Sequence, residues 1–232
     1  MSIDPVGPDV RYLCTKGSIR WIVPGYLVEK ISIFDVFQLF THTMVSTPCG
    51  QKLYYYASLV LDLGNSQQLR VTAVCLGNIC RSPIAEAVLR DRIQAAGLSE
   101  KVVVDSAGTG DWHLGHEADP RSQAILSQNG YLLTHSARQI TSSWMDEIDI
   151  ILVMDSSNYL NVEALVRDSG FTPELHMIRS FDLDLAHYDN LSPELDVPDP
   201  YYDRDNGYAL VLKMIERAAE EFVAWLPARL NQ

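Results

Sequence analysis

The sequence predicts an α/β fold with three layers (α-β-α), in which helices cover both faces of a small parallel sheet of about four strands. Two observations support this class. From Leu69 onward, short apolar runs typical of buried strands alternate with longer stretches typical of helices, and such alternation predicts a parallel sheet. The first run ends at Cys75 and leads into a short loop, which predicts a phosphate-binding loop after the first strand.

Turn and capping residues bound the elements. Asp119-Pro120 is typical of a helix start, and Gly97 and Gly130 are typical of helix ends. Strands are expected at Val71–Cys75, Val102–Asp105, Ile148–Met154 and Leu175–Ile178. Helices are expected at Ile84–Ala96, at 120–130, from Asp155 or Ser156 to about Val166, and at Gly207–Leu230. Residues 181–205, rich in Asp and Pro, are predicted to form a long loop.

The most specific chemical signal is the segment Cys75-Leu-Gly-Asn-Ile-Cys-Arg-Ser-Pro, which leads into a predicted helix. Backbone N–H groups in such a curled loop, and at the helix N-terminus, can bind the oxygens of a phosphate dianion. Gly77 permits backbone angles that a side chain would disfavour, and Arg81 can close the cradle with a bidentate fork. The same positive surroundings favour a thiolate at Cys75, so the loop predicts a cysteine that attacks phosphorus.

Spacing alone does not identify this site, because Cys14-Thr-Lys-Gly-Ser-Ile-Arg20 has the same interval between cysteine and arginine. Arg20 is followed by Trp-Ile-Val-Pro-Gly, and Pro24-Gly25 disfavours a helix there. Arg81 is followed instead by Ser-Pro and a run of good helix formers. We therefore assign the phosphate site to the loop after Cys75.

The chain is predicted to have two parts. Residues 1–68 form an N-terminal extension of unknown role, either a small added subdomain or a poorly ordered or over-long start, and residues 69–232 form the functional domain. The net charge is −12, and the extension contributes none of it, because its five basic residues balance its five acidic ones. The acidic domain argues against nucleic acid and anionic membranes as partners.

The four cysteines, at positions 14, 49, 75 and 80, show no spacing typical of a disulfide framework or a zinc site. No apolar run reaches the roughly 18 residues of a spanning helix, and no signal-peptide pattern is evident. We expect a cytoplasmic monomer or weak dimer that needs no metal and no cofactor, with export without a standard signal peptide left open. Under oxidation, Cys80 could form a reversible disulfide with Cys75.

The loop after Cys75 resembles the signature loop of the low-molecular-weight protein tyrosine phosphatases. The resemblance runs from about Leu69 to the C-terminus and implies hydrolysis of phosphotyrosine in proteins, and of small aryl phosphates, through a cysteinyl-phosphate intermediate. Four more segments resemble the family in the same order: Asp105-Ser-Ala-Gly-Thr-Gly-Asp-Trp-His-Leu-Gly, His135-Ser-Ala-Arg-Gln-Ile, Ile151-Leu-Val-Met-Asp-Ser-Ser-Asn and Asp199-Pro-Tyr-Tyr.

A general acid is also needed, because tyrosinate leaves slowly unless its oxygen is protonated. Composition alone leaves four candidates in the predicted loop, Asp196, Asp199, Asp203 and Asp205. The resemblance assigns the role to Asp199. The proline that follows it favours an extended backbone and helps to fix where the carboxyl group points.

The resemblance implies roles for the remaining residues of the site. The catalytic residues are expected to be Cys75 as nucleophile, Arg81 as phosphate ligand and Asp199 as general acid and base. Substrate-binding residues are expected to be Leu76, Gly77, Asn78, Ile79, Cys80, Trp112, Tyr201 and Tyr202. Ser82, Ser106 and His135 are expected to hold the loop and orient the thiolate. Aromatic side chains at the rim suit phosphotyrosine, whereas phosphoserine is too short to bring its phosphorus to the cradle.

Three alternative functions share this loop. Arsenate reductases resemble it but need further cysteines downstream, and none follows Cys80. Protein arginine phosphatases carry a small polar residue where this chain has Ile79, and an isoleucine favours a flat aromatic ring. A phosphotyrosine-binding module without turnover is the third alternative, and nothing in the sequence favours it, because Cys75, Arg81 and Asp199 are all present.

Overall fold

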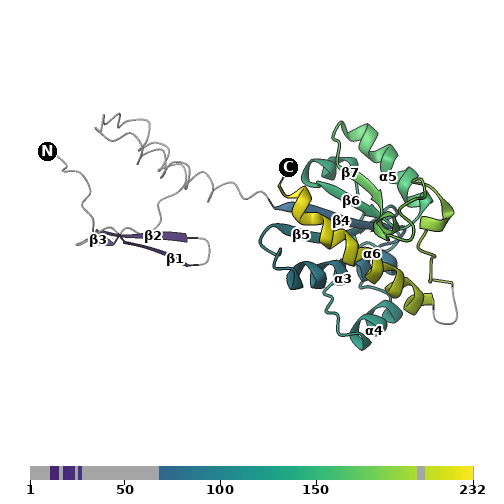
Figure 1. Cartoon of the computed structure of the whole chain (residues 1–232), viewed down its shortest axis with the longest axis horizontal. Helices are drawn as coiled ribbons and strands as arrows, with labels where there is room; N and C mark the ends of the chain where they lie inside the picture. The colour runs from purple at the N-terminus through teal and green to yellow at the C-terminus, as the bar shows by residue number, and fades with distance from the viewer. Residues whose placement is uncertain (1–10, 16–17, 24–25, 28–67, 203–206, 232) are drawn as a thin grey trace. The chain divides into compact units, whose positions relative to one another are not determined.

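The computed structural model describes residues 11–15, 18–23, 26–27, 68–202 and 207–231 of the chain. The chain divides into two compact units, Met1–Gly64 and Asn65–Gln232, and each is considered by itself. In the first unit, β1 (Arg11–Thr15), β2 (Ser18–Val23) and β3 (Tyr26–Leu27) form an antiparallel sheet in that order (Figure 1).

This sheet contains Cys14 and Arg20, which have the same spacing as Cys75 and Arg81. Cys14 on β1 pairs with Ile19 on β2, and Leu13 pairs with Arg20. Cys14 and Arg20 therefore lie on two paired strands, so no helix begins at Arg20, as a phosphate cradle would need. The assignment of the site to the other interval agrees with this pairing.

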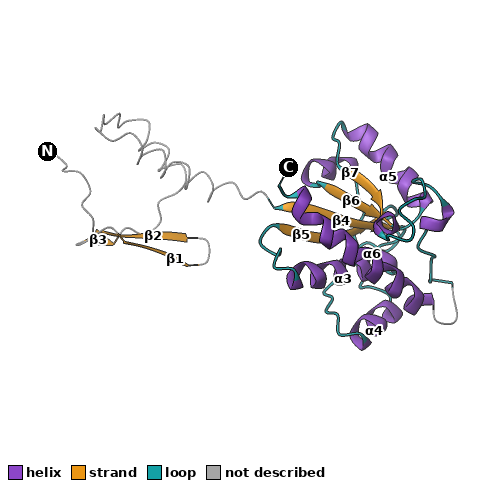
Figure 2. Cartoon of the chain, viewed as in Figure 1, coloured by secondary structure: helices purple, strands orange, loops and turns teal. Residues whose placement is uncertain are grey.

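The second unit is built on a parallel sheet of four strands, as predicted. These are β4 (Leu69–Cys75), β5 (Val102–Gly108), β6 (Ile150–Val153) and β7 (Glu174–Met177), in the order β5-β4-β6-β7. The strand that carries Cys75 thus lies between two neighbours (Figure 2). Because the chain adds β5 on one side of β4 and β6 on the other, the end of β4 is a switch point of the topology, where open α/β sheets bind ligands.

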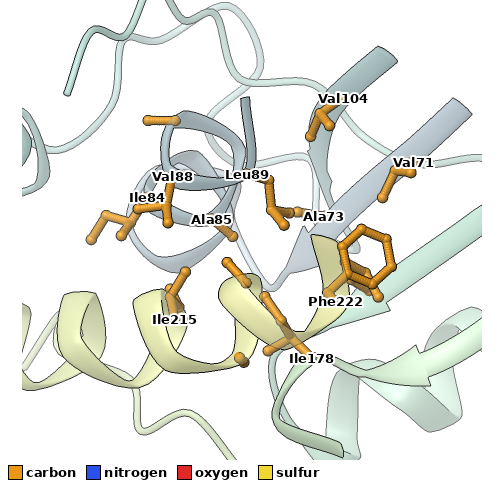
Figure 3. Close-up of a cluster of buried hydrophobic side chains, with 14 of the residues drawn as sticks. Val71, Ala73, Ile84, Ala85, Val88, Leu89, Val104, Ile178, Ile215 and Phe222 are labelled. Atoms are coloured by element: carbon orange, nitrogen blue, oxygen red, sulfur yellow. The ribbon is translucent and has the colours of Figure 1, made fainter. Parts of the chain in front are cut away.

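Helices cover both faces of the sheet and complete the predicted three layers. They are α3 (Arg81–Ala95), α4 (Pro120–Gln128), α5 (Ser156–Ser169) and α6 (Gly207–Arg229), with short 3-10 helices at Ser142–Glu147, Ile178–Phe181 and Pro193–Leu195. Side chains alternate along a strand. Val71 and Ala73 of β4 therefore pack with α3 and α6, around residues such as Phe222 (Figure 3), while Val74 packs on the opposite face with residues of α5.

The helix ends follow the predicted chemistry. The side chain of Asp119 accepts a hydrogen bond from the Arg121 amide at 2.8 Å and caps α4, with Pro120 as the first helical residue. Of the two candidate caps for α5, Asp155 is the one used, because its side chain accepts from the Asn158 amide at 2.7 Å. Gly97 follows α3 with a φ of +70°, a backbone conformation that favours glycine.

Some element bounds differ from the prediction. Strand β5 continues three residues past Asp105, to Gly108, because it stays paired with β4 as far as Cys75. Its last residues are small, with weak strand preference, and pairing with the neighbouring strand overrides that preference. Helix α3 begins at Arg81, three residues earlier than predicted. In the described part of the chain, no helix is both long and apolar enough to cross a membrane.

Candidate active site

The loop of residues 76–80 joins the carboxyl end of β4 directly to the first turn of α3. Pro83 is the third residue of that helix, so it lies in the first turn, where its missing N–H removes no helical hydrogen bond. Arg81 opens the helix and is 3% exposed. The loop therefore lies between a buried strand end and a helix N-terminus, both of which fix its ends.

The carbonyl groups of this loop accept hydrogen bonds from neighbouring segments. Acceptors include the carbonyls of Cys75, Leu76 and Ile79, which bind the amides of Thr109, Gly110 and Asp119 at 2.9, 2.8 and 2.8 Å. Within the described residues, the amide groups of residues 77–80 have no acceptor among backbone or side-chain atoms. A run of amide groups without an acceptor, next to a helix N-terminus, is suited to bind an anion.

Asn78 holds the loop in shape from its centre. Its φ of +54° lies in the left-handed region, which asparagine tolerates better than most residues. Its buried amide donates to the hydroxyls of Ser82 and Ser106, both at 2.9 Å, and its Oδ1 accepts from the Arg138 amide at 2.9 Å. One side chain thus ties the loop to α3, β5 and the segment that follows α4.

Replacing Asn78 by alanine is expected to lower the free energy of unfolding by about 2–3 kcal/mol, because three hydrogen bonds, two of them buried, are lost and a β-carbon stays in the left-handed region. Urea unfolding measures this change. Asn78→Gly keeps the backbone freedom but loses the same hydrogen bonds, so it should recover part of the stability. An Asn78→Ala protein as stable as the parent would contradict this account.

The sulfur of Cys75 lies 3.1 Å from the hydroxyl oxygen of Ser82. That hydroxyl also donates to the Ala107 carbonyl at 3.1 Å and accepts from Asn78. A hydroxyl has one hydrogen but two acceptor positions, so Ser82 can turn its hydrogen toward a thiolate without leaving its site. The structure therefore brings Ser82 against the sulfur, where the sequence predicted a supporting residue.

The guanidinium of Arg81 is bound by two carboxylates. One is Asp155, the N-cap of α5, and the other is Asp199, whose Oδ2 accepts from Nη2 at 2.8 Å. Nη1 also donates to the Val197 carbonyl at 3.1 Å. Burial opposes the charge, but Cys75, Asp199 and Asp155 outweigh it and raise the pKa of Arg81 above its ordinary value. The side chain is therefore a permanent, buried cation directly after the loop.

His135 supports the loop from the segment after α4. Its Nε2 lies 2.7 Å from the Asn78 carbonyl, and its Nδ1 lies 3.7 Å from Oε2 of Glu86, which also accepts from the Ser106 hydroxyl at 2.6 Å. Burial raises the pKa of Glu86, but hydrogen bonds from His135 and Ser106, with the charge of Arg90, outweigh it and lower the pKa below its usual value. An ionised carboxylate thus lies beneath the loop.

The segment of residues 196–202 carries the candidate acid. Asp199 is 37% exposed on its side chain, and its Oδ1 accepts from the Tyr201 amide at 3.0 Å. The rival Asp196 accepts from the Ser156 amide at 2.8 Å and from its hydroxyl at 3.3 Å, so it stabilises the start of α5. Asp203 and Asp205 lie outside the described residues.

The predicted aromatic residues lie at the surface. Trp112 is 68% exposed, Tyr201 40% and Tyr202 88%, and the two tyrosine rings meet edge to face at 5.0 Å. Trp112 lies over Gly110, where a β-carbon would come within 1.8 Å of the ring. Leu76 in the loop is 43% exposed. Exposed apolar side chains of this kind can receive a flat ring.

Cys80, predicted to bind substrate, is buried, and its sulfur lies 3.3 Å from the Tyr208 hydroxyl of α6. Burial raises the pKa of its thiol to about 12, so the thiol stays protonated at neutral pH. The hypothesis of a disulfide with Cys75 stays a prediction.

Other polar residues of the site were not in the predicted set, although they contact it. Each lies far along the chain from its partner, so the local sequence gave little signal. The exception is Glu86, an acidic residue within an otherwise apolar run. These residues are Glu86 on α3, Arg138 on the segment after α4, Asp155 as a partner of Arg81, and Asp119 and Arg121 at the start of α4.

Comparison with known sequences gives one consistent result. The sequence model of the family described as "Low molecular weight phosphotyrosine protein phosphatase" matches residues 70–232. A "Low molecular weight protein-tyrosine-phosphatase" of Streptomyces coelicolor is 43% identical over 155 residues, which cover 67% of this chain and 92% of the relative.

Solved structures with the same fold include two of particular interest. YfkJ from Bacillus subtilis matches with a TM-score of 0.62 at 33% identity, covering 70% of this chain and 96% of its own. A Drosophila arginine phosphatase matches with a TM-score of 0.62 at 28% identity, covering 68% of this chain and 98% of its own. The fold is therefore shared by phosphatases that differ in the residue they are named for.

Proposed function

This chain belongs to the low molecular weight phosphotyrosine protein phosphatase family, and from that premise we propose that it hydrolyses phosphotyrosine in proteins through a phosphocysteine intermediate on Cys75. The family makes it an enzyme of the protein-tyrosine-phosphatase class. The observation that carries the mechanism is the convergence of a sulfur, four free amide groups, a buried guanidinium and a carboxylate around one short loop.

In the first step, the thiolate of Cys75 attacks phosphorus and the bond to the aryl oxygen breaks. The amide groups of residues 77–80 and the guanidinium of Arg81 bind the three other oxygens, where charge accumulates in the transition state. Asp199, protonated at this stage, donates its proton to the leaving oxygen so that a phenol and not a phenolate departs. Its link to Arg81 supports this role, because it places the carboxylate beside the phosphate ligand.

In the second step, a water molecule attacks the phosphorus of the phosphocysteine. Asp199, now a carboxylate, takes a proton from that water, and the bond from sulfur to phosphorus breaks to release the thiolate and inorganic phosphate. The hydroxyl of Ser82 can donate to the departing sulfur, because it lies 3.1 Å away. Ser106 and His135 act through Asn78 and keep the loop in shape.

The proposed substrate class rests on the rim of the site. Tyr201, Tyr202, Trp112 and Leu76 offer exposed apolar surface, and Ile79 is an apolar residue within the loop itself. A phosphotyrosine ring would lie against these side chains while its phosphate reaches the cradle. We propose phosphotyrosine-bearing proteins as partners, a cytoplasmic location that keeps Cys75 reduced, and a monomer or weak dimer. Residues 69–232 are proposed as the phosphatase domain, with no role assigned to residues 1–68.

Replacing Asp199 by asparagine is expected to lower kcat/KM for phenyl phosphate by about 10²–10³-fold, because a strongly basic phenolate must then leave unprotonated. Dinitrophenyl phosphate has a weakly basic leaving group and should lose much less. Steady-state kinetics on both esters measures the difference. An equal loss on both, or none on phenyl phosphate, would exclude Asp199 as the acid.

The likeness to an arginine phosphatase suggests one alternative activity, hydrolysis of phosphoarginine, and kinetics can distinguish it from hydrolysis of phosphotyrosine. Matched peptides carrying phosphotyrosine or phosphoarginine would be compared by kcat/KM. The buried, apolar Ile79 in the loop favours the phosphotyrosine peptide. Preference for phosphoarginine would overturn the substrate class but leave the role of Cys75 intact. Binding without turnover of either peptide would support a binding module.

A further inference from the structure

The first turn of α4 is bonded to both loops that form the site. On one side, the amide of Asp119 donates to the Ile79 carbonyl at 2.8 Å, and the Ser122 hydroxyl donates to the same carbonyl at 3.3 Å. On the other side, Nη1 of Arg121 donates to the Tyr201 carbonyl at 3.1 Å. Residues of α4 thus connect the phosphate loop to the segment that carries Asp199.

The guanidinium of Arg121 is held in one orientation. Nε and Nη2 bind the two oxygens of Asp119 at 3.0 and 2.9 Å, a fork that lysine cannot form. Its plane lies over the Tyr208 ring at 4.8 Å and near the Tyr201 ring at 5.6 Å. The hydrogen bonds to Asp119 raise the pKa of Arg121 above its ordinary value. With the guanidinium held in this way, Nη1 is the atom that donates to the Tyr201 carbonyl.

The bond to Tyr201 leads directly to the acid. The amide of Tyr201 donates to Oδ1 of Asp199 at 3.0 Å, while Oδ2 of Asp199 accepts from Arg81. When Arg81 binds a phosphoryl group, its donors are shared with that group. Among the described residues, the other hydrogen bond that directs the Asp199 carboxyl group is then the one from the Tyr201 amide. The position of Tyr201, and hence of Asp199, then depends on Arg121.

We propose that Arg121 is a positioning residue for the general acid, acting through Tyr201 and oriented by Asp119. The inference rests on the proposed function and extends it. Arg121 touches neither the phosphoryl group nor the leaving oxygen, so it should affect only the step that needs a correctly placed proton. A loss of geometry of this kind commonly costs one to two orders of magnitude in rate, or about 10–100-fold.

The test uses Arg121→Gln in the full chain, with phenyl phosphate and dinitrophenyl phosphate as substrates. The expected result is a fall in kcat/KM of about tenfold or more on phenyl phosphate and less than about twofold on dinitrophenyl phosphate, because only the first ester needs protonation. In an Asp199→Asn background, the same replacement should have no further effect on phenyl phosphate. That non-additivity would show that Arg121 acts through the acid.

Two further variants keep the test decisive. Asp119→Asn keeps a good helix cap but weakens the fork, so it should show the same selective loss to a smaller degree. Arg92→Gln is the matched control, because Arg92 is also half-exposed and lies over a tyrosine ring, that of Tyr131 at 6.0 Å, at the far end of α3. It should leave both esters unchanged.

Equal losses on the two esters, or additive effects with Asp199→Asn, would overturn the inference and indicate a purely structural role. The proposed function fails separately, if the parent protein hydrolyses neither ester. If the parent is active and Asp199→Asn shows its selective loss while Arg121→Gln shows none, the function stands and the role of Arg121 is excluded.

Discussion

Replacing Cys75 by serine is expected to reduce kcat for an aryl phosphate by about four orders of magnitude or more, because the attacking group becomes a neutral hydroxyl. Among the described residues, the side chain that contacts the sulfur is that of Ser82, and its hydroxyl group is not a base that could take the proton of the new hydroxyl. The new side chain is smaller by less than a methyl group, so the loop should keep its shape. Steady-state kinetics measures the loss.

The mechanism also predicts a covalent species. Acid quenching of the parent protein during turnover should trap one phosphoryl group on Cys75, visible by mass spectrometry of the peptide, and Cys75→Ser should show none. Cys14→Ser is the control, because Cys14 has the same spacing to an arginine but lies on the paired strand β1. It should retain full activity. An active Cys75→Ser protein would refute the nucleophile.

Replacing Arg81 by lysine is expected to lower kcat/KM by about 10³-fold, although the positive charge is kept. An ammonium group is a point charge, and it cannot present two parallel N–H donors to a phosphoryl group. In this structure it would also leave the Val197 carbonyl or one of the two carboxylates without its donor. Kinetics on an aryl phosphate, with inhibition by inorganic phosphate, measures both transition-state and ground-state binding.

Arg92→Lys provides the control for this replacement, because it changes the same residue type on the same helix, at the end away from the loop. It should be neutral. If Arg81→Lys were as active as the parent, the guanidinium would act only as a charge, and the bidentate part of the mechanism would be wrong.

The sequence predicted best what is encoded locally. The loop after Cys75 reads as a strand, a turn and a helix start within a dozen residues, and the Asp119 cap with Pro120 is equally local. The fold class followed from alternation of apolar runs. The strand bounds were less accurate, because β5 continues to Gly108 through pairing with β4 and not through the preferences of its own residues.

Contacts between distant segments could not be derived in this way. Arg81 meets Asp155 and Asp199, which lie 74 and 118 positions further along the chain. Glu86 meets Ser106 because α3 and β5 lie side by side in the fold, and Arg121 meets Tyr201 across 80 positions. Only the packing of the sheet and its helices determines these pairs. The proposed acid, Asp199, was chosen through a family resemblance, whereas composition alone left four candidates.

The pairing of Arg81 with Asp199 has a consequence for how the protein handles anions. The cation at the mouth of the loop already has an internal counter-ion, so an incoming anion must exchange with it. A monovalent anion gains little from that exchange. A phosphate dianion also binds the loop amides, and these hydrogen bonds can offset the free energy lost when Arg81 separates from Asp199. On a chain of net charge −12, the proposed site would therefore favour phosphate over the monovalent anions of ordinary salt. If Asp199 is the general acid, as proposed, the same exchange would release its carboxyl group from Arg81 at the moment when the substrate binds.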